Sequence, residues 1–353
     1  MLSQERAIEI YSLEAERVNM QQDKYGRVLS ACANHNIFEP QVSQWIYGRG
    51  FRPTWPGGHP FAVCISHDID VIFKKEQNKP IYFGGFSNVI NIAKYELGRR
   101  FLNYDKNYVD EDQSPSKVIA INEELGIKSS YYFLSLNKGD QDFNYETTAA
   151  ELEGIFNIIT EQGSEIGLHG GHSAYRDFEK LLIEKENLVK SLGNPLSGYR
   201  NHYLRFDTKK TWSFLQKVGF EYDTTLGYAD CAGFRNGMCY PFRPFDMVEQ
   251  KMEDIFEIPL IVMDHSLFAY MEFDKEAIFR ILKQFISSIK SVNGVFSLLW
   301  HNDKFSGLAL DIYTEIIEYL KKEDALFITG KDLITYWKSK EYHIDLEERL
   351  FKA

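Results

Sequence analysis

The fold of this chain is decided by the stretch Phe61-Ala62-Val63-Cys64-Ile65-Ser66-His67-Asp68-Ile69-Asp70. It begins with a short, mostly apolar run that follows the turn-rich segment 52–58. Such a run is typical of a strand buried on both faces, as strands of parallel sheets are. The run then ends in imidazole and carboxylate side chains. Because functional side chains of parallel α/β barrels gather at the carboxyl ends of the strands, we expect a site there.

The same pattern recurs along the chain. Further strands are predicted at 129–134, 165–168, 196–199, 222–225, 255–260, 295–300 and 325–328. Helical patterns lie between most of them, at 116–125, 147–162, 175–192, 208–218, 275–292 and 308–322. This alternation predicts a parallel sheet covered by helices, and seven or eight such units over roughly 290 residues suit a TIM-type barrel or a distorted relative.

We divide the chain into three parts. Residues 1–55 have a helix-forming composition and form an N-terminal helical extension, residues 56–340 form the barrel, and residues 341–353 form a C-terminal tail. Two long segments, 71–115 and 227–250, break the alternation after strands. Long loops that follow barrel strands lie at the mouth of the barrel and are often functional, so we expect both segments there.

The charge balance excludes one class of partner. The 353 residues contain 40 Lys and Arg against 51 Asp and Glu, which gives a net charge of −11. Binding a nucleic-acid backbone needs an excess of basic residues, so we expect a small molecule, a glycan or another protein as the partner. Homo-oligomerisation stays open.

The composition also bears on location. Hydrophobic residues make up 44% and charged residues 26%, as in ordinary globular proteins. No apolar run approaches the roughly 18 to 20 residues that span a bilayer, and the first residues lack a signal-peptide pattern, so we expect a cytoplasmic protein without a membrane span. The four cysteines are few and scattered, which indicates a reducing compartment rather than a disulfide framework.

Polar side chains end four of the predicted strands, within 66–70, 168–173, 198–203 and 299–303. In a parallel barrel these ends converge on one face. Carboxylates, imidazoles and an arginine would meet there, which predicts a hydrolytic metal site.

The metal ligands are expected among carboxylates and histidines. Of Asp68 and Asp70, one can ligate a cation while the other stays free as a base, although one could instead cap a turn and the other be solvated. His169 and His172 would face one point if the chain enters a helical turn there. A lone histidine after an apolar strand is more often a core residue, but two of them, with Asp70 and His202 elsewhere, favour a metal.

Two further residues suit catalytic roles. Arg200 can hold a carboxylate in a bidentate pair and so orient Asp68, or it can form a purely structural ion pair. His301 could donate a proton to a leaving group, or be a buried, hydrogen-bonded histidine. Substrate contacts at the mouth are expected from four residues, although each could serve structure alone: Trp300, Asp223, Tyr228 and Arg235.

Together the ordered motifs Ser-His-Asp-Ile-Asp, Leu-His-Gly-Gly-His-Ser, Arg-Asn-His-Tyr, Tyr-Asp-Thr-Thr and Leu-Leu-Trp-His-Asn resemble those of the polysaccharide deacetylases, the NodB-homology domain of carbohydrate esterase family four. The resemblance covers residues 60–335 and is that of a divergent member. It implies a distorted (β/α)7 TIM-like barrel that binds a divalent cation, most often zinc, and hydrolyses acetyl groups on sugars.

The resemblance also implies roles for single residues. Asp68 matches the catalytic base, and Arg200 the arginine that tethers this base. Asp70 and His169 match metal ligands. Tyr203 would help to bind the oxyanion through its backbone N–H, and His301 matches the general acid.

The second metal histidine departs from the family pattern. It usually comes four residues after the first, where this chain has Ser173, with His172 one position earlier. Either His172 takes the role, or His202, which stands where proline is usual, supplies the ligand, or the site binds metal poorly. We expect His172 ahead of His202. Asn302 also replaces an aspartate that is common beside the acid histidine.

The resemblance therefore predicts a metal-dependent carbohydrate deacetylase, an amidohydrolase that removes acetyl groups, N-acetyl first, from a sugar or polysaccharide precursor. The altered second motif keeps another class open, a catalytically silent glycan-binding or scaffolding relative. A third class is a glycosidase that uses Asp68 and a second carboxylate without metal. Metal content and released acetate separate the three.

Overall fold

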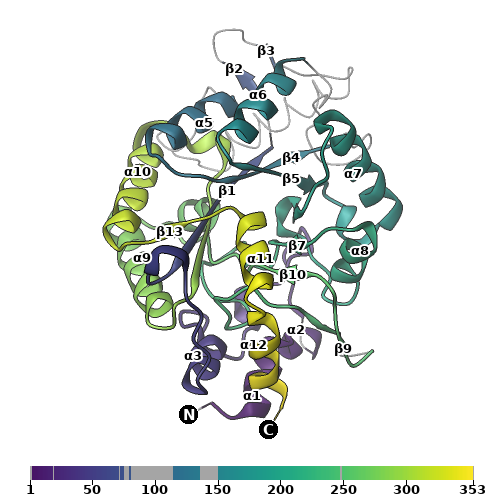
Figure 1. Ribbon diagram of the computed structural model, residues 1–353, viewed down its shortest axis with the longest axis vertical. Helices are drawn as coiled ribbons and strands as arrows, with labels where there is room; N and C mark the ends of the chain where they lie inside the picture. The colour runs from purple at the N-terminus through teal and green to yellow at the C-terminus, as the bar shows by residue number, and fades with distance from the viewer. Residues whose placement is uncertain are drawn as a thin grey trace.

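The computed structural model describes residues 2–18, 20–70, 72–74, 79–80, 114–135, 150–246 and 249–352. Within these residues the main strands are β1 (Ala62–Ile69), β4 (Ser130–Leu134), β5 (Glu165–Gly170), β6 (Gly198–Asn201), β7 (Tyr222–Asp223), β10 (Phe256–Glu257), β11 (Val262–Met263), β12 (Val295–Leu299) and β13 (Leu326–Phe327). They form one curled sheet in the order β10-β7-β6-β5-β4-β1-β12-β11, with β13 beside the start of β1, and every pair is parallel (Figure 1). The predicted (β/α)7 barrel is confirmed.

One segment of chain joins the two edges of this sheet. β10 pairs with β7, and β11, four residues further on, pairs with β12. Pro259 interrupts the strand between them because proline has no N–H to donate. There the Ser297 hydroxyl replaces the missing hydrogen bonds between strands. It accepts a hydrogen bond from Ile261 N at 3.0 Å and donates one to the Pro259 carbonyl. Counted as one interrupted strand, β10 and β11 give the barrel its seventh position.

Helices surround these strands (Figure 1). They are α5 (Pro115–Glu124), α6 (Ala150–Glu161), α7 (Phe178–Leu192), α8 (Thr211–Val218), α9 (Lys275–Lys290) and α10 (Gly307–Lys322). In α9 the apolar residues Ile278, Leu282 and Ile289 recur at helical spacing and are buried, so this face packs on the sheet. The helix begins where the Asp274 side chain accepts from Ala277 N at 2.8 Å.

β1 runs further than the apolar run alone predicts, and all eight of its residues are buried. Side chains alternate along a strand, so His67 and Asp68 point to opposite faces. His67 lies with its Nδ1 2.8 Å from the Trp300 carbonyl and its Nε2 2.8 Å from Asn122, and burial lowers its pKa to about 4. It is therefore a neutral packing residue, while Asp68 faces the barrel interior.

The extension and the C-terminal end lie together, with both termini at the same end of the molecule (Figure 1). They contain α1 (Gln4–Tyr11), α2 (Glu14–Val18), α3 (Gln41–Gly48), α11 (Gly330–Ser339) and α12 (Tyr342–Phe351). Residues 341–353, expected to be a tail, thus contain a helix that buries Leu346 and Leu350. Apolar residues of the extension, such as Ile10 and Val42, belong to the same continuous core as the barrel.

The two long segments have different outcomes. Most of 71–115 lies outside the described residues, apart from the antiparallel pair β2 (Phe73–Lys74) and β3 (Lys79–Pro80) and the start of α5. In 227–250, by contrast, Phe234 and Tyr240 are fully buried, and Val42 N donates to the Gly237 carbonyl at 3.0 Å. This segment, which ends at the pair β8 (Phe245–Asp246) and β9 (Lys251–Met252), anchors the extension instead of forming an open loop at the mouth.

None of the described helices is both long and apolar enough to cross a membrane.

Candidate metal-dependent active site

Three side chains from the carboxyl ends of three strands meet at one point of the barrel. Asp70 follows β1, His169 lies in β5, and His202 begins η6 (His202–Leu204), the helical turn that follows β6. One carboxylate oxygen and two ring nitrogens lie within 4.8 Å of one another. Asp70 Oδ1 is 3.1 Å from His169 Nε2, and Asp70 Oδ2 is 3.6 Å from His202 Nε2. The geometry brings together the donors of a metal site, which we call the triad.

The residues of the triad fit a cation. His169 Nδ1 lies 3.0 Å from the Arg200 carbonyl, which can only accept, so Nδ1 carries the proton and Nε2 presents its lone pair. His169 Nε2 and Asp70 Oδ1 are both buried without a hydrogen-bond partner, and such atoms need a partner that a cation can supply. Two imidazoles and one carboxylate form the donor set of catalytic zinc sites.

The two histidines of the triad influence the charge of Asp70. Loss of solvent would raise the pKa of this carboxyl, but the imidazoles of His202 and His169, when they are protonated, outweigh that effect and hold the pKa well below its ordinary value. Asp70 is therefore an anion over the whole neutral range, as a ligand must be.

On one side of the triad, Arg200 holds Asp68. Its Nη1 donates to Asp68 Oδ1 at 3.1 Å and to the Ser66 hydroxyl at 2.8 Å, so the contact with the carboxylate is single and not bidentate. The guanidinium is itself fixed, because Nε donates to the Thr224 carbonyl at 3.1 Å. The other oxygen of Asp68 lies 3.7 Å from His169 Nε2. Asp68 thus presents one tethered oxygen and one that faces the triad.

On the other side, His301 faces the triad with its Nε2 3.9 Å from Asp70 Oδ2. Its Nδ1 lies 2.7 Å from Asp264 Oδ1, and its backbone N donates to Asp264 Oδ2 at 2.7 Å. Burial by itself would lower the pKa of His301, but the Asp264 carboxylate outweighs burial and raises the pKa to about 9. The imidazole is therefore protonated at neutral pH and can act as an acid.

Asp264 is a site residue to which the sequence analysis gave no role. It is fully buried and directly follows β11. The predicted strand, 255–260, ended three residues before the end of β11 at Met263. The signal that could have found Asp264 is the apolar pair Val262–Met263, which ends in a polar residue as the other site strands do.

Tyr203 turns the chain sharply beside the triad. Its φ is +64° and that of Leu204 is +54°, so two consecutive non-glycine residues occupy the left-handed region. Each costs of order 1–2 kcal/mol, which the surrounding packing must offset. The ring of Tyr203 lies 4.4 Å from that of His202, centroid to centroid. This turn carries His202 towards Asp70.

His172, expected as the third ligand ahead of His202, is not part of the triad. β5 continues through Gly170 and is followed by a turn, so His169 and His172 do not share one helical face. Instead, His172 Nδ1 lies 2.6 Å from Arg205 Nη1, and its lone pair accepts from this donor-only group. The alternative, His202, is the histidine that the structure brings to Asp70 and His169.

The four expected substrate contacts are all buried in the structure. Trp300 is fully buried and donates through Nε1 to the Lys304 carbonyl at 3.2 Å. Arg235 forms a two-pronged pair with Glu16 of α2, and its guanidinium lies over the Tyr228 ring. Asp223 is fully buried at the end of β7. All four side chains make their contacts within the protein in this structure, and their role as substrate contacts stays a prediction.

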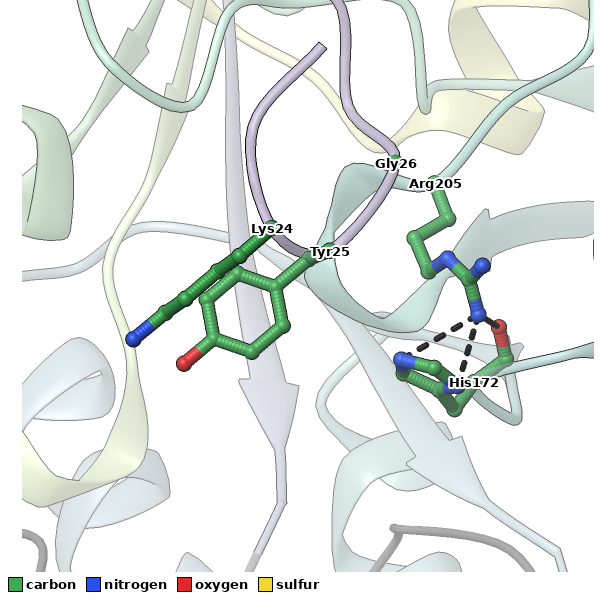
Figure 2. Close-up of a pocket in the computed structure, with 5 residues that line it drawn as sticks. All are labelled: Lys24, Tyr25, Gly26, His172 and Arg205. Carbon is green, nitrogen blue, oxygen red and sulfur yellow. Dashed lines mark hydrogen bonds between the residues drawn. The ribbon is translucent and has the colours of Figure 1, made fainter.

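A pocket of about 360 Å³ lies between the extension and the barrel, and Figure 2 shows its lining residues. It is lined by Lys24, Tyr25, Gly26, His172 and Arg205. The ring of Tyr203 contacts the rings of Tyr25 and His172, at centroid distances of 5.0 and 5.4 Å, as well as that of His202. The extension therefore supplies part of a pocket that is one aromatic ring away from the triad.

No family model matches the sequence, and no curated protein matches it either. Solved structures do match in fold. Two are described as polysaccharide deacetylases: one from Mycobacterium smegmatis (14% identity, TM-score 0.55, 82% of this chain and 94% of the other covered) and one from Pseudomonas aeruginosa PAO1 (14%, 0.55, 84% and 98%). The PuuE allantoinase matches over 92% of this chain and 99% of its own length, with 15% identity and a TM-score of 0.55. The chain therefore has the barrel fold of these proteins, as the resemblance of its motifs to polysaccharide deacetylases predicts.

Proposed function

We propose that this protein is a metal-dependent amidohydrolase that removes acetyl groups from an N-acetylated sugar or polysaccharide precursor. The observation that carries the proposal is the triad of Asp70, His169 and His202, with Asp68 3.7 Å from His169 and His301 3.9 Å from Asp70. An acid and a base that both border one metal site suit the hydrolysis of an amide.

Asp70, His169 and His202 would hold the metal, and zinc suits this donor set best. Three protein ligands are the number that catalytic zinc sites use, so a cation held by these residues could still take up a water. When bound, the cation would polarise the acetyl carbonyl and lower the pKa of a bound water to about 7.

The residues beside the triad would move the protons. Asp68 would accept the proton of the attacking water, because Arg200 fixes one oxygen and the other faces the triad. The Tyr203 backbone N–H would donate to the oxyanion, in the role that the resemblance implies. His301, protonated at neutral pH, would then donate a proton to the leaving amine as acetate departs.

The metal is tested by elemental analysis of the purified protein and of two histidine variants. We expect about one equivalent of zinc in the wild type and in His172→Ala, and little in His202→Ala, since His172 instead contacts Arg205. Equal zinc in His202→Ala and loss in His172→Ala would overturn the ligand assignment. No metal in the wild type, even after titration, would leave a glycan-binding or scaffolding protein as the better account.

The reaction is tested by acetate release from N-acetylated chitooligosaccharides and from monomeric N-acetyl sugars. Allantoin is a useful comparison substrate, because an allantoinase has the same fold and hydrolyses a C–N bond. Acetate release that depends on metal and on Asp68 supports a deacetylase. Turnover of allantoin without acetate release from any sugar would instead assign the site to another amide.

A further inference from the structure

The pocket beside the triad is cationic in a chain that is acidic as a whole. Its lining contains Lys24 and Arg205 and no carboxylate, whereas the chain carries a net charge of −11. Across the described parts of the chain, neither cation has a carboxylate within ion-pair distance. Their nearest ring contacts are with tyrosines, since Lys24 Nζ lies 4.9 Å from the centre of the Tyr25 ring.

Arg205 is the more informative of the two cations because it is buried, with only 8% of its surface exposed. Its Nη1 donates to the His172 carbonyl at 2.8 Å and its Nη2 to the Tyr175 hydroxyl at 3.1 Å, while Nε has no hydrogen-bond partner. All these acceptors are neutral. A buried guanidinium without a counter-charge is costly, and an anion that enters the pocket would remove that cost.

The loop that carries Lys24 is built to sit over Arg205. Gln22 and Val28 form an antiparallel bridge, and the Asp23 carboxylate accepts from Tyr25 N at 2.8 Å and from Arg27 N at 3.0 Å. Gly26 has a φ of +76°, which favours glycine, and a β-carbon there would lie 3.6 Å from Arg205 Nη2. The close approach of this hairpin makes one pocket from the extension and the barrel.

The pocket has a defined relation to the chemistry. His202 of the triad, Tyr203 and His172 of the pocket form a chain of ring contacts, with centroid distances of 4.4 and 5.4 Å. Arg205 also follows His202 by only three residues. A ligand that is one or two sugar units long could therefore place its acetyl group at the triad and a second group at Arg205.

We propose that this pocket binds an oxyanion of the substrate, so that the substrate is an acetylated sugar that also carries a phosphate or a carboxylate. The assignment of this anion to a substrate rests on the proposed deacetylase function. A guanidinium and an ammonium both favour such groups, and Arg205 offers donors only. A neutral sugar would leave the buried guanidinium of Arg205 without a counter-charge.

The test compares sugars that differ in one charged group. Binding to the purified full-length protein is measured by calorimetry for N-acetylglucosamine 1-phosphate, N-acetylglucosamine 6-phosphate, N-acetylglucosaminuronic acid and the neutral methyl N-acetylglucosaminide. We expect at least one anionic sugar to bind about ten- to a hundredfold more tightly than the neutral glycoside, the gain of one or two charge-assisted hydrogen bonds. The sugar that gains most distinguishes phosphate from carboxylate.

Substitutions at the two cations of the pocket test whether the preference for anionic sugars arises there. Lys24→Gln, at an exposed position, and Arg205→Gln should each reduce the preference for the anionic sugar about tenfold or more, and Arg205→Lys should retain part of it. Lys210→Gln removes the same charge from an exposed residue outside the pocket and should retain the full preference. Repeating the measurement on chelator-treated protein excludes direct binding of phosphate to metal, because the preference should persist without it.

Equal affinity for charged and neutral sugars, or a preference that survives in both Lys24→Gln and Arg205→Gln, would overturn the proposal. Acetate release is measured in parallel, so that a failure of the anion site can be distinguished from a failure of the proposed deacetylase function. A preference that depends on the pocket without acetate from any sugar would contradict the deacetylase and retain the anion site. Equal kcat/KM for the neutral and charged sugars would retain the deacetylase and remove the anion site.

Discussion

His301 owes its protonation chiefly to the buried carboxylate of Asp264, which together with Asp70 and Asp68 raises the pKa of the imidazole to about 9. A histidine with a raised pKa stays charged until the pH exceeds that value. If His301 is the acid, activity should therefore persist through neutral pH, and loss of the His301 proton should set the alkaline limb of the pH profile.

Asp264→Asn should move this alkaline limb to lower pH. The amide retains an acceptor for His301 Nδ1 but removes the negative charge, so the pKa of His301 should fall towards its ordinary value of about 6.5. The measurement is the pH profile of kcat/KM, together with NMR titration of the ring. An unchanged alkaline limb would show that another group limits the rate there.

Asp68→Asn tests the base without disturbing its tether. Asparagine has a similar shape and still offers an oxygen to Arg200 Nη1, which lies 3.1 Å from Asp68 Oδ1. We expect kcat to fall about 10²- to 10⁴-fold, the typical contribution of a positioned base. Metal content and the circular dichroism spectrum should match the wild type. A variant with more than a tenth of the wild-type kcat would exclude Asp68 as the base.

The polar strand ends could be predicted from the sequence, because the apolar runs stop abruptly before them. Three residues predicted in this way, Asp68, Asp70 and His169, lie at the site in the structure. The sequence left the third member of the triad open between His172 and His202, because the choice depends on backbone turns. The chain leaves β5 in a turn that directs His172 to Arg205, and the left-handed Tyr203 carries His202 inward. Nor does a single sequence reveal that Trp300 points into the core.

At the scale of elements, α2 is attached to the barrel through one buried ion pair. Arg235 Nη2 and Glu16 Oε2 lie 2.7 Å apart, and both side chains are less than 5% exposed. Removing one member of such a pair leaves a buried charge without a partner, which costs about 3–5 kcal/mol. The pair therefore couples the extension, which supplies Lys24 and Tyr25 to the pocket, to the loop that anchors it.

Arg235→Met should lower the free energy of unfolding by about 3–5 kcal/mol, measured by urea denaturation. The double variant Glu16→Leu with Arg235→Met removes both charges and should recover part of the loss. As a control, Lys321→Ala breaks an exposed pair with Glu318 and should cost less than about 1 kcal/mol. A loss in Arg235→Met no larger than in this control would mean that water solvates Glu16 after the change.

Elements with strong periodicity could be predicted closely from sequence. The pattern at 308–322 became α10 (Gly307–Lys322), and the run at 129–134 became β4 (Ser130–Leu134). α12 was not expected, because its ten residues bury only Leu346 and Leu350, too few to show a helical stripe. It is stable in this position because α1, α3 and α11 pack around it.

At the scale of the whole molecule, the segment that closes the barrel also brings two carboxyl groups together. In the register of β7 and β10, Glu257 lies opposite Asp223, and both are fully buried. Burial raises the pKa of Asp223 to about 6, and burial together with Asp223 raises that of Glu257 well above its ordinary value. The closed barrel therefore holds a proton that the unfolded chain releases near pH 4.

This proton makes stability depend on pH with a definite sign. The pKa values of the pair are higher in the folded protein than in the unfolded chain. The protonated pair therefore makes its full contribution to the free energy of unfolding below about pH 4, and this contribution is lost as the pH rises through 6. For Asp223 alone the loss amounts to about 3 kcal/mol between these limits. Asp223→Asn supplies a permanently neutral group of the same shape, so the variant should lose less stability between pH 5 and 8 than the wild type.

The measurement is urea denaturation of wild type and Asp223→Asn at pH 5, 6, 7 and 8, with the exposed Asp311→Asn as the matched control. The difference in unfolding free energy between wild type and Asp223→Asn should shift in favour of the variant as the pH rises, while Asp311→Asn should follow the wild type. Parallel curves for all three proteins would mean that the pair ionises without cost, and hence that water reaches the junction of β7 and β10. In that case the barrel would be open at this seam, and its closure would rest on β11 and β12 alone.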